Sequence, residues 1–213
     1  INYAKKIQDA LMTSKNYISK IFPESFIFFE PKDVVSGDFY WAHKNSSDYV
    51  YFTVADCTGH GVPGAFMSLI GTSLLNEMII ENKVMDTNLI LDNISDKLKN
   101  SLEYKEGETQ PKDGMDMVLC RLNKNRNELM FTGAKNSLIL IRDGKLTEFK
   151  GDKRPVGHYI GKGIKFTAQK IPVKKNDIIY IFSDGLADQF GGVKNKKYMS
   201  SRLKKFLLEI NDI

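Results

Sequence analysis

The chain has 213 residues, of which 42% are hydrophobic and 27% charged, and its net charge at neutral pH is +5. This composition is typical of a globular domain and argues against the disordered and fibrous classes. The basic residues are scattered, no stretch approaches the ~18 apolar residues of a membrane helix, and Cys57 and Cys120 lack C-x-x-C spacing. We therefore expect a cytoplasmic protein with reduced thiols, no nucleic-acid partner and no direct membrane insertion.

An amphipathic helix is expected at the N-terminus. A stripe of residues spaced alternately three and four apart indicates a helix that ends before Pro23, and its members are Ala4, Ile7, Leu11, Ser14, Ile18 and Ile21. Residues 1–22 are accordingly interpreted as a linker or regulatory helix, and residues 23–213 as the main domain. Three roles stay open for the helix: docking on its own domain, joining an upstream sensor or dimerisation module, and forming a homodimer seam. The chain does not begin with Met, so we expect a fragment of a longer protein.

Three strands are predicted next, at Ser25–Glu30, Asp38–His43 and Tyr49–Ala55. Short linkers of Gly, Ser, Asn and Asp separate them, which favours antiparallel hairpins over helical crossovers. Two helices should follow, at Pro63–Glu81, with its proline in the opening turn, and at Asp86–Tyr104.

After a polar stretch at Lys105–Asp113, the sequence returns to strands and ends on a helix. The predicted strands are 115–122, 128–132, 137–142, 145–149, 164–171 and 177–183, and the last helix is 199–210. The dipeptide Asp143-Gly144 is a strong signal for a hairpin turn. This order of elements predicts an α+β fold in which two antiparallel sheets form a sandwich and the helices pack outside.

The segment VADCTGHGVPG holds Gly59, Gly61 and Gly64 at the G-x-G-x-x-G spacing of dinucleotide-binding loops. Such a fold needs a second parallel strand, with an acidic residue about 20 residues later that binds the ribose. Here a second helix takes that place, and Glu81 and Asp86 lie at a helix end and a helix cap. The nucleotide interpretation is therefore disfavoured, and it would require measurable binding of NAD or FAD.

Three acidic residues stand beside glycines at predicted strand ends. Asp56 and Asp184 each follow an apolar strand, and Asp38 opens one. A buried lone carboxylate is costly without a compensating cation or hydrogen bonds, and Mg²⁺ and Mn²⁺ prefer oxygen ligands. The pattern indicates a hard-cation site assembled by a sheet. The alternative is that each aspartate caps a turn.

Five motifs occur in an order that resembles one protein family. They are VSGDFYW, VADCTGHGVPGAFMS, FTGAKNSLILIRDGKL, RPVG and IIYIFSDGLADQFGG. Together they resemble the SpoIIE-type branch of the PPM metal-dependent protein serine/threonine phosphatases, from about Pro31 to Leu207. The resemblance implies a four-layer α-β-β-α sandwich with a two-metal centre at one edge of the sheets.

The resemblance also implies roles for individual residues. Asp56 would bridge two Mn²⁺ or Mg²⁺ ions, Cys57 would offer its backbone carbonyl to one of them, Asp38 would support the second ion, and Asp184 would complete the first. For Cys57 a ligating thiolate is the alternative, although hard ions prefer oxygen. Two such ions activate a water in line with a phosphoserine or phosphothreonine. His60 is the candidate general acid, and hydrogen bonding within its loop is the alternative.

Some features fit the family pattern less closely. Asp113 and Asp116 lie where relatives can hold a third ion, with turn capping as the alternative for Asp113. No arginine precedes Asp38, and the nearest cation is Lys32, for which a solvated surface role is the alternative. The family's terminal strand, with its Asp-Asp-x-Thr-like motif and further metal-binding acid, has no counterpart here. Either the chain is truncated before that strand or the site is naturally incomplete.

These observations lead to a functional expectation. We expect the catalytic module of a bacterial signalling protein that hydrolyses phosphoserine or phosphothreonine on a regulatory protein. Family analogy suggests a phosphorylated anti-sigma-factor antagonist as the partner. The module would be cytoplasmic, and tethering to a membrane sensor in the full-length protein stays open. The alternative is a non-catalytic interaction module that keeps the phosphatase fold.

Overall fold

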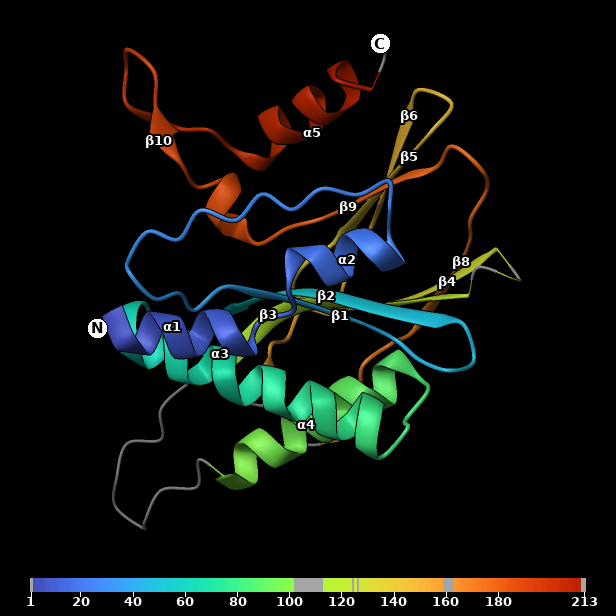
Figure 1. The fold of residues 1–213 in the computed structure, drawn as a ribbon. Helices are drawn as coiled ribbons and strands as arrows, with labels where there is room; N and C mark the ends of the chain where they lie inside the picture. Colours follow the sequence, from blue (N-terminus) through green and yellow to red (C-terminus); the bar gives the residue numbers. More distant parts are fainter. Residues whose placement is uncertain (1, 102–112, 124, 126, 159–162, 212–213) are drawn as a thin grey trace.

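Figure 1 shows the fold in a computed structural model, which describes residues 2–101, 113–123, 125, 127–158 and 163–211. Two antiparallel sheets form its centre. The large sheet contains β1 (Phe39–Lys44), β2 (Tyr49–Cys57), β3 (Gly114–Asn123), β4 (Glu128–Ala134) and β8 (Gln169–Pro172) in this order, with β7 (Val156–Gly157) paired to β3. The small sheet has the order β6 (Lys145–Phe149), β5 (Leu138–Arg142) and β9 (Ile178–Ile181).

Helices cover both outer faces of this pair of sheets. The remaining elements are α1 (Asn2–Leu11), α2 (Lys15–Ile21), α3 (Gly61–Leu75), which continues as the π-helix η1 (Asn76–Glu81), α4 (Thr87–Ser101), the 3-10 helix η3 (Asp184–Leu186), the hairpin β10 (Phe190–Gly191) and β11 (Lys196–Lys197), and α5 (Ser200–Glu209). In Figure 1, α3 and α4 lie below the large sheet and α5 lies above the small one.

Three hydrophobic clusters hold the layers together. The first joins α3 and α4 to the large sheet, the second fills the space between the sheets, and the third joins the small sheet to α5. Strand β3 serves two of them because alternate side chains point to opposite faces. Met117 and Leu119 face the helices, whereas Val118 and Cys120 face the small sheet. The predicted four-layer α-β-β-α sandwich is therefore confirmed.

The single helix predicted for residues 4–21 is wrong, because the structure divides it into α1 and α2. Ser14 caps the second helix, its hydroxyl accepting the Tyr17 N–H at 3.2 Å. The predicted stripe fails on α1, where Ile7 and Leu11 are 42% and 54% exposed and the buried residue is Gln8. A polar side chain therefore docks this helix, which an apolar stripe cannot predict.

The strand predicted at Ser25–Glu30 is also wrong. Within the described part of the chain this segment joins no sheet, although it is rich in β-forming aromatics. Its rings pack singly instead: Phe29 lies edge-on to Tyr40, and Phe26 contacts Tyr180 of β9 with ring centroids 6.3 Å apart. Propensity alone does not make a strand where no neighbouring strand offers its backbone groups.

The boundaries of the other predicted elements differ less from those in the structure. The strand predicted at 164–171 begins only at Gln169, because the Phe166 N–H bonds to the carboxylate of Asp92 rather than to a neighbouring strand. The last residues of the helix predicted at 86–104 and most of the polar stretch at 105–113 lie outside the described residues. Lys145–Phe149 matches its prediction, and the hairpin turn before it has positive φ at Asp143 and Gly144, as such turns require.

The helix over Gly61–Glu81 has the length and apolar composition that a membrane span requires, contrary to the expectation from sequence. Half of this window is buried inside the fold. Met67, Leu75 and Ile79 belong to the cluster between the helices and the large sheet. Packing as a core helix therefore accounts for the composition of this segment.

Candidate metal centre

The three aspartates singled out in the sequence lie at neighbouring edges of the two sheets. Phe39 is paired with Ala55 across β1 and β2, so Asp38 and Asp56 lie at the same end of this strand pair. Asp184 begins η3, shortly after β9 of the small sheet ends at Ile181. The Ser183 hydroxyl donates to Asp38 Oδ2 at 2.6 Å and so joins two loops that are 145 residues apart. The structure therefore brings the three aspartates together.

Electrostatics confirm that these carboxyl groups interact. The pKa of Asp56 is raised to about 8. Burial is the largest cause, and the charges of Asp38 and Asp184 and their hydrogen bonds to Asp56 add to it. Without a cation, a proton therefore stays on the Asp56 carboxyl group at neutral pH. Among the described residues, no lysine, arginine or histidine forms an ion pair with any of the three.

The glycines of the loop allow close approach of backbones around this edge. A Cβ on Gly64 would lie 2.5 Å from the Gly59 carbonyl oxygen, and one on Gly37 would lie 2.9 Å from the same atom. Gly59 and Gly61 have φ values of +87° and +63°, which glycine adopts without a steric penalty. The G-x-G-x-x-G spacing therefore reflects a sharp turn from β2 into α3 that packs against the loop before Asp38.

Cys57 is the last residue of β2 and is buried. Burial, and then the charges of Asp56 and Asp38, raise the pKa of its thiol well above the usual value. A thiolate is therefore disfavoured here in the absence of metal. The backbone carbonyl oxygen of Cys57 lies close to Gly37, 3.2 Å from where a Cβ of that residue would be.

His60 lies at the start of α3, and its side chain is 87% exposed. Its Nδ1 is 3.4 Å from the Asp33 carboxylate. The sequence prediction did not include Asp33, because nothing in the pattern relates it to His60. The structure thus places the candidate acid at the surface and against a carboxylate from the loop before β1.

The other candidate residues have separate partners. Asp113 accepts a hydrogen bond from the Thr58 hydroxyl at 3.2 Å, a contact with a residue 55 positions away rather than a cap on its own turn. Asp116 forms an ion pair with Lys135. Lys32 is exposed, which agrees with the alternative that it is a solvated surface residue.

Sequence reasoning missed Gln8, which fastens α1 to the loop before Asp38. Its Nε2 donates to the Ser36 carbonyl oxygen at 2.6 Å and to the Ser68 hydroxyl of α3 at 2.8 Å, and its Oε1 accepts the Ser36 N–H at 3.0 Å. All three residues are buried. The only signal in the sequence was a polar residue in the middle of an amphipathic helix. This clamp fixes the backbone two residues before Asp38 against α3.

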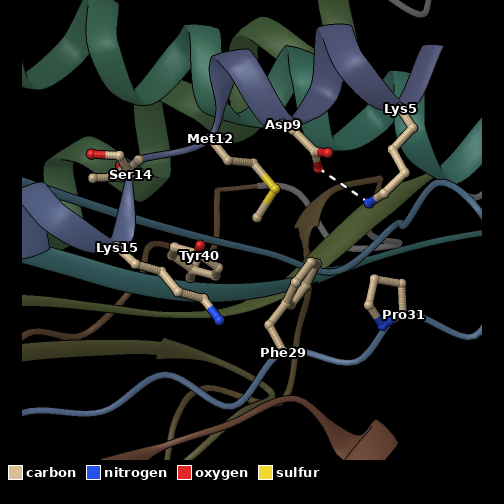
Figure 2. A pocket seen from close by; sticks show the side chains of 9 residues that line it. Lys5, Asp9, Met12, Ser14, Lys15, Phe29, Pro31 and Tyr40 are labelled. Atoms are coloured by element: carbon tan, nitrogen blue, oxygen red, sulfur yellow. Dashed lines mark hydrogen bonds and ion pairs between the residues drawn. The ribbon is translucent and has the colours of Figure 1, made fainter. Parts of the chain in front are cut away.

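A separate pocket of about 310 Å³ lies beside the N-terminal helices. Figure 2 shows Lys5 and Asp9 of α1 and Met12, which follows α1, on one side and Phe29 and Tyr40 on the other. Its lining includes none of the three aspartates, so it is distinct from the metal centre.

The three aspartates supply the kind of oxygen atoms that a hard divalent cation prefers, although their side chains do not surround an ion. Within the described ranges, no three His, Cys, Asp or Glu side chains converge closely enough to enclose an ion as they stand. The donors are carboxylate oxygens, which Mg²⁺ and Mn²⁺ prefer, and these ions keep several waters. The raised pKa of Asp56 reflects like charges that a bound cation would relieve. The residues present therefore suit Mn²⁺ or Mg²⁺ better than a thiolate-binding metal.

Comparisons with solved structures identify the class of protein. The PP2C domain of SiaA from Pseudomonas aeruginosa is 28% identical, with a TM-score of 0.84 over 98% of this chain and 80% of that one. The RsbU and RsbW domains of Rv1364c from Mycobacterium tuberculosis give 19% identity and a TM-score of 0.66, covering 86% of this chain and 48% of that one. The chain therefore has the fold of a PP2C phosphatase domain.

Two further results give the family. The profile of the family described as Stage II sporulation protein E (SpoIIE) matches residues 46–210, so the chain belongs to the SpoIIE family. The PP2C phosphatase domain of SpoIIE from Bacillus subtilis, solved with a fragment of its regulatory domain, is 18% identical with a TM-score of 0.63. That match covers 84% of this chain and 51% of the other. No curated protein sequence gives a significant match.

Proposed function

We propose that this chain is the phosphatase module of a bacterial signalling protein and hydrolyses phosphoserine or phosphothreonine on a regulatory protein. The observation that carries the proposal is the cluster of Asp38, Asp56 and Asp184, which lack a protein cation among the described residues. A carboxylate cluster of this kind would suit divalent cations. The PP2C fold and membership of the SpoIIE family support the phosphatase class.

Each residue of the centre has a proposed role. Asp38, Asp56 and Asp184 would hold two Mn²⁺ or Mg²⁺ ions, with the carbonyl oxygen of Cys57 as a further ligand. When bound, such ions supply a water of lowered pKa and neutralise charge on the phosphoryl oxygens. Ser183 keeps Asp38 in place through its 2.6 Å hydrogen bond.

His60 is the proposed general acid for the leaving serine or threonine oxygen. Its exposure leaves it accessible to a phosphoprotein, and Asp33, whose carboxylate lies 3.4 Å from Nδ1, would orient the ring. Nε2 would then face the substrate. Hydrogen bonding within the loop remains the alternative role, and an activity profile of His60→Gln against pH distinguishes the two.

The proposed partner is a phosphorylated regulatory protein of the anti-sigma-factor antagonist type. Support comes from the names of two structures with the same fold, the RsbU and RsbW domains of Rv1364c and a bacterial stressosome protein. We place the module in the cytoplasm, where such regulators act, and α1 and α2 would connect it to an upstream sensor or dimerisation module.

The test measures release of phosphate from phosphoserine peptides by the full-length protein, with and without Mn²⁺. Asp56→Asn should lower the rate roughly 100-fold or more, because a metal's stabilisation of transition-state charge is worth several kcal/mol. Asp188→Asn is the matched control, since this aspartate pairs with Lys197 and should keep most activity. A wild-type rate no higher than that of Asp56→Asn would favour the non-catalytic interaction module.

A further inference from the structure

A fourth carboxylate, that of Asp116, lies beside the proposed metal centre. Asp116 is on β3, paired with Asp56 of β2 in the antiparallel register. Its side chain is 32% exposed, and Asp184 is among the charges that act on it. By position and chemistry it is as suitable a ligand for a hard cation as the three aspartates of the centre.

Asp116 differs from those three because the protein supplies it with a cation. Lys135 Nζ lies 3.1 Å from both Oδ1 and Oδ2 of the carboxylate. Burial raises the pKa of Asp116, and the ammonium group of Lys135 opposes this rise while Asp184 adds to it. The lysine therefore favours the charged form of this carboxylate.

The backbone at Lys135 holds this ammonium group at the centre. The residue follows β4, whose last residue Ala134 pairs with Met117, so Lys135 comes next to Asp116 across the strands. Its φ of +58° lies in the left-handed region, which lysine rarely adopts. The Lys135 N–H donates to the Asp152 carbonyl oxygen at 2.7 Å and holds the turn in this conformation.

We propose that Lys135 takes the cation position at Asp116, so that divalent ions are confined to Asp38, Asp56 and Asp184. Lys135 is then a residue that determines how many ions the centre binds. This inference rests on the proposed function, because it assumes that the three aspartates hold metal. An ammonium group paired with Asp116 also repels any divalent ion that approaches this carboxylate.

The experiment counts bound Mn²⁺ by electron paramagnetic resonance of the free ion, in the full-length protein. Lys135→Gly removes the ammonium group and suits the left-handed backbone. Lys135→Arg keeps the charge, and the double variant Lys135→Gly with Asp116→Asn removes both partners. Circular dichroism checks that each variant is folded.

We expect Lys135→Gly to bind one more Mn²⁺ per chain than the wild type, with affinity at Asp116 raised roughly tenfold or more. The extra ion should be absent in Lys135→Arg and in the double variant. If Lys135→Gly bound the same number of Mn²⁺ ions as the wild type, with the same affinity, the inference would be overturned. If Lys135→Gly raised the KM but bound the same number of Mn²⁺ ions as the wild type, the inference would also be overturned. Lys135 would then contact the substrate phosphate directly.

The same titration separates this inference from the proposed function. If the wild type binds Mn²⁺ no better than Asp56→Asn, the proposed metal centre is wrong, and the inference about Lys135 is wrong as well. If Asp56 is needed for binding but Lys135→Gly gains no ion, the centre stands and only the role of Lys135 is wrong.

Discussion

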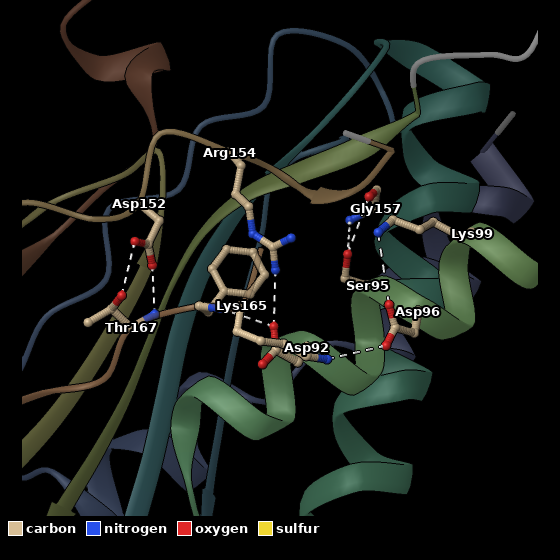
Figure 3. A network of polar contacts seen from close by, with 10 residues as sticks. Asp92, Ser95, Asp96, Lys99, Asp152, Arg154, Gly157, Lys165 and Thr167 are labelled. Carbon is tan, nitrogen blue, oxygen red and sulfur yellow. Dashed lines mark hydrogen bonds and ion pairs between the residues drawn. The ribbon is translucent and has the colours of Figure 1, made fainter. Parts of the chain in front are cut away.

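Two aspartates taken out of bulk water, Asp92 and Asp56, have opposite surroundings. Asp92 of α4 is 6% exposed and accepts hydrogen bonds from Arg154 at 3.0 Å and from the Phe166 N–H at 3.1 Å. Figure 3 shows the contact between Arg154 and Asp92 within this network. The Arg154 guanidinium also lies over the Phe166 ring, 3.8 Å from its centroid. Asp56 of β2 is half-buried, and its nearest charged groups are other carboxylates.

The difference separates an aspartate that holds the fold from one whose surroundings would favour a bound cation. The chain supplies Asp92 with its own cation, and the pair fastens α4 to the loop that follows β6. At Asp56 the chain gathers like charges, at a cost that only a proton or an external cation removes. Burial alone does not distinguish the two cases, whereas the sign of the neighbouring charge does.

The largest expected effect on stability comes from breaking the buried pair. Asp92→Ala leaves Arg154 buried without a counter-charge and should lower the free energy of unfolding by about 3–5 kcal/mol. Asp188→Ala is the control, because its pair with Lys197 is exposed and should be worth about 0–1 kcal/mol. Urea denaturation measures both. Equal losses would mean that the pair of Asp92 and Arg154 does not hold α4 as described.

A smaller effect is expected from the neutral clamp on α1. Gln8→Leu removes the donor to the buried Ser36 carbonyl oxygen and to the buried Ser68 hydroxyl. The free energy of unfolding should fall by about 2–3 kcal/mol. The variant should also weaken Mn²⁺ binding, because Ser36 is two residues from Asp38. Gln169→Leu, which loses an exposed bond, should stay within about 0.5 kcal/mol of the wild type. Unchanged Mn²⁺ affinity in Gln8→Leu would separate α1 from the metal centre.

A third effect is a pH dependence of the metal-free protein. The pKa of Asp56 is about 8 in the fold, above its ordinary value of 3.8, so the folded state binds more protons than the unfolded state between these values. Stability from this group is therefore present at low pH and is lost as pH rises toward 8. Asp56→Asn should reduce this loss in urea titrations with EDTA at pH 5 and pH 8. An identical loss in the variant would assign the dependence to other groups.

Much of the fold could be predicted because its strands carry local signals. Their apolar segments and the Asp143-Gly144 turn predicted β3, β4, β5 and β6 to within a few residues. The errors occurred where distant contacts decide the local structure. Phe26 and Phe29 have strand propensity but no pairing partner, and the break between α1 and α2 depends on a single cap at Ser14.

The candidate site was predicted less completely. Asp38, Asp56 and Asp184 could be found because each interrupts an apolar strand end beside a glycine, and the structure brings them together. The residues that surround this centre could not be found in the same way. Gln8 and Lys135 act from elements far along the chain, and their importance follows only from tertiary contacts.

The central claim is that Asp56 and its neighbours await a divalent cation, and binding of Mn²⁺ at neutral pH tests it most directly. Isothermal titration of the full-length protein should give binding that Asp56→Asn weakens at least roughly tenfold, since the variant loses a unit charge at the ion. Asp92→Asn, measured where it remains folded, should bind as the wild type does. Equal Mn²⁺ affinity in the wild type and Asp56→Asn would contradict the account.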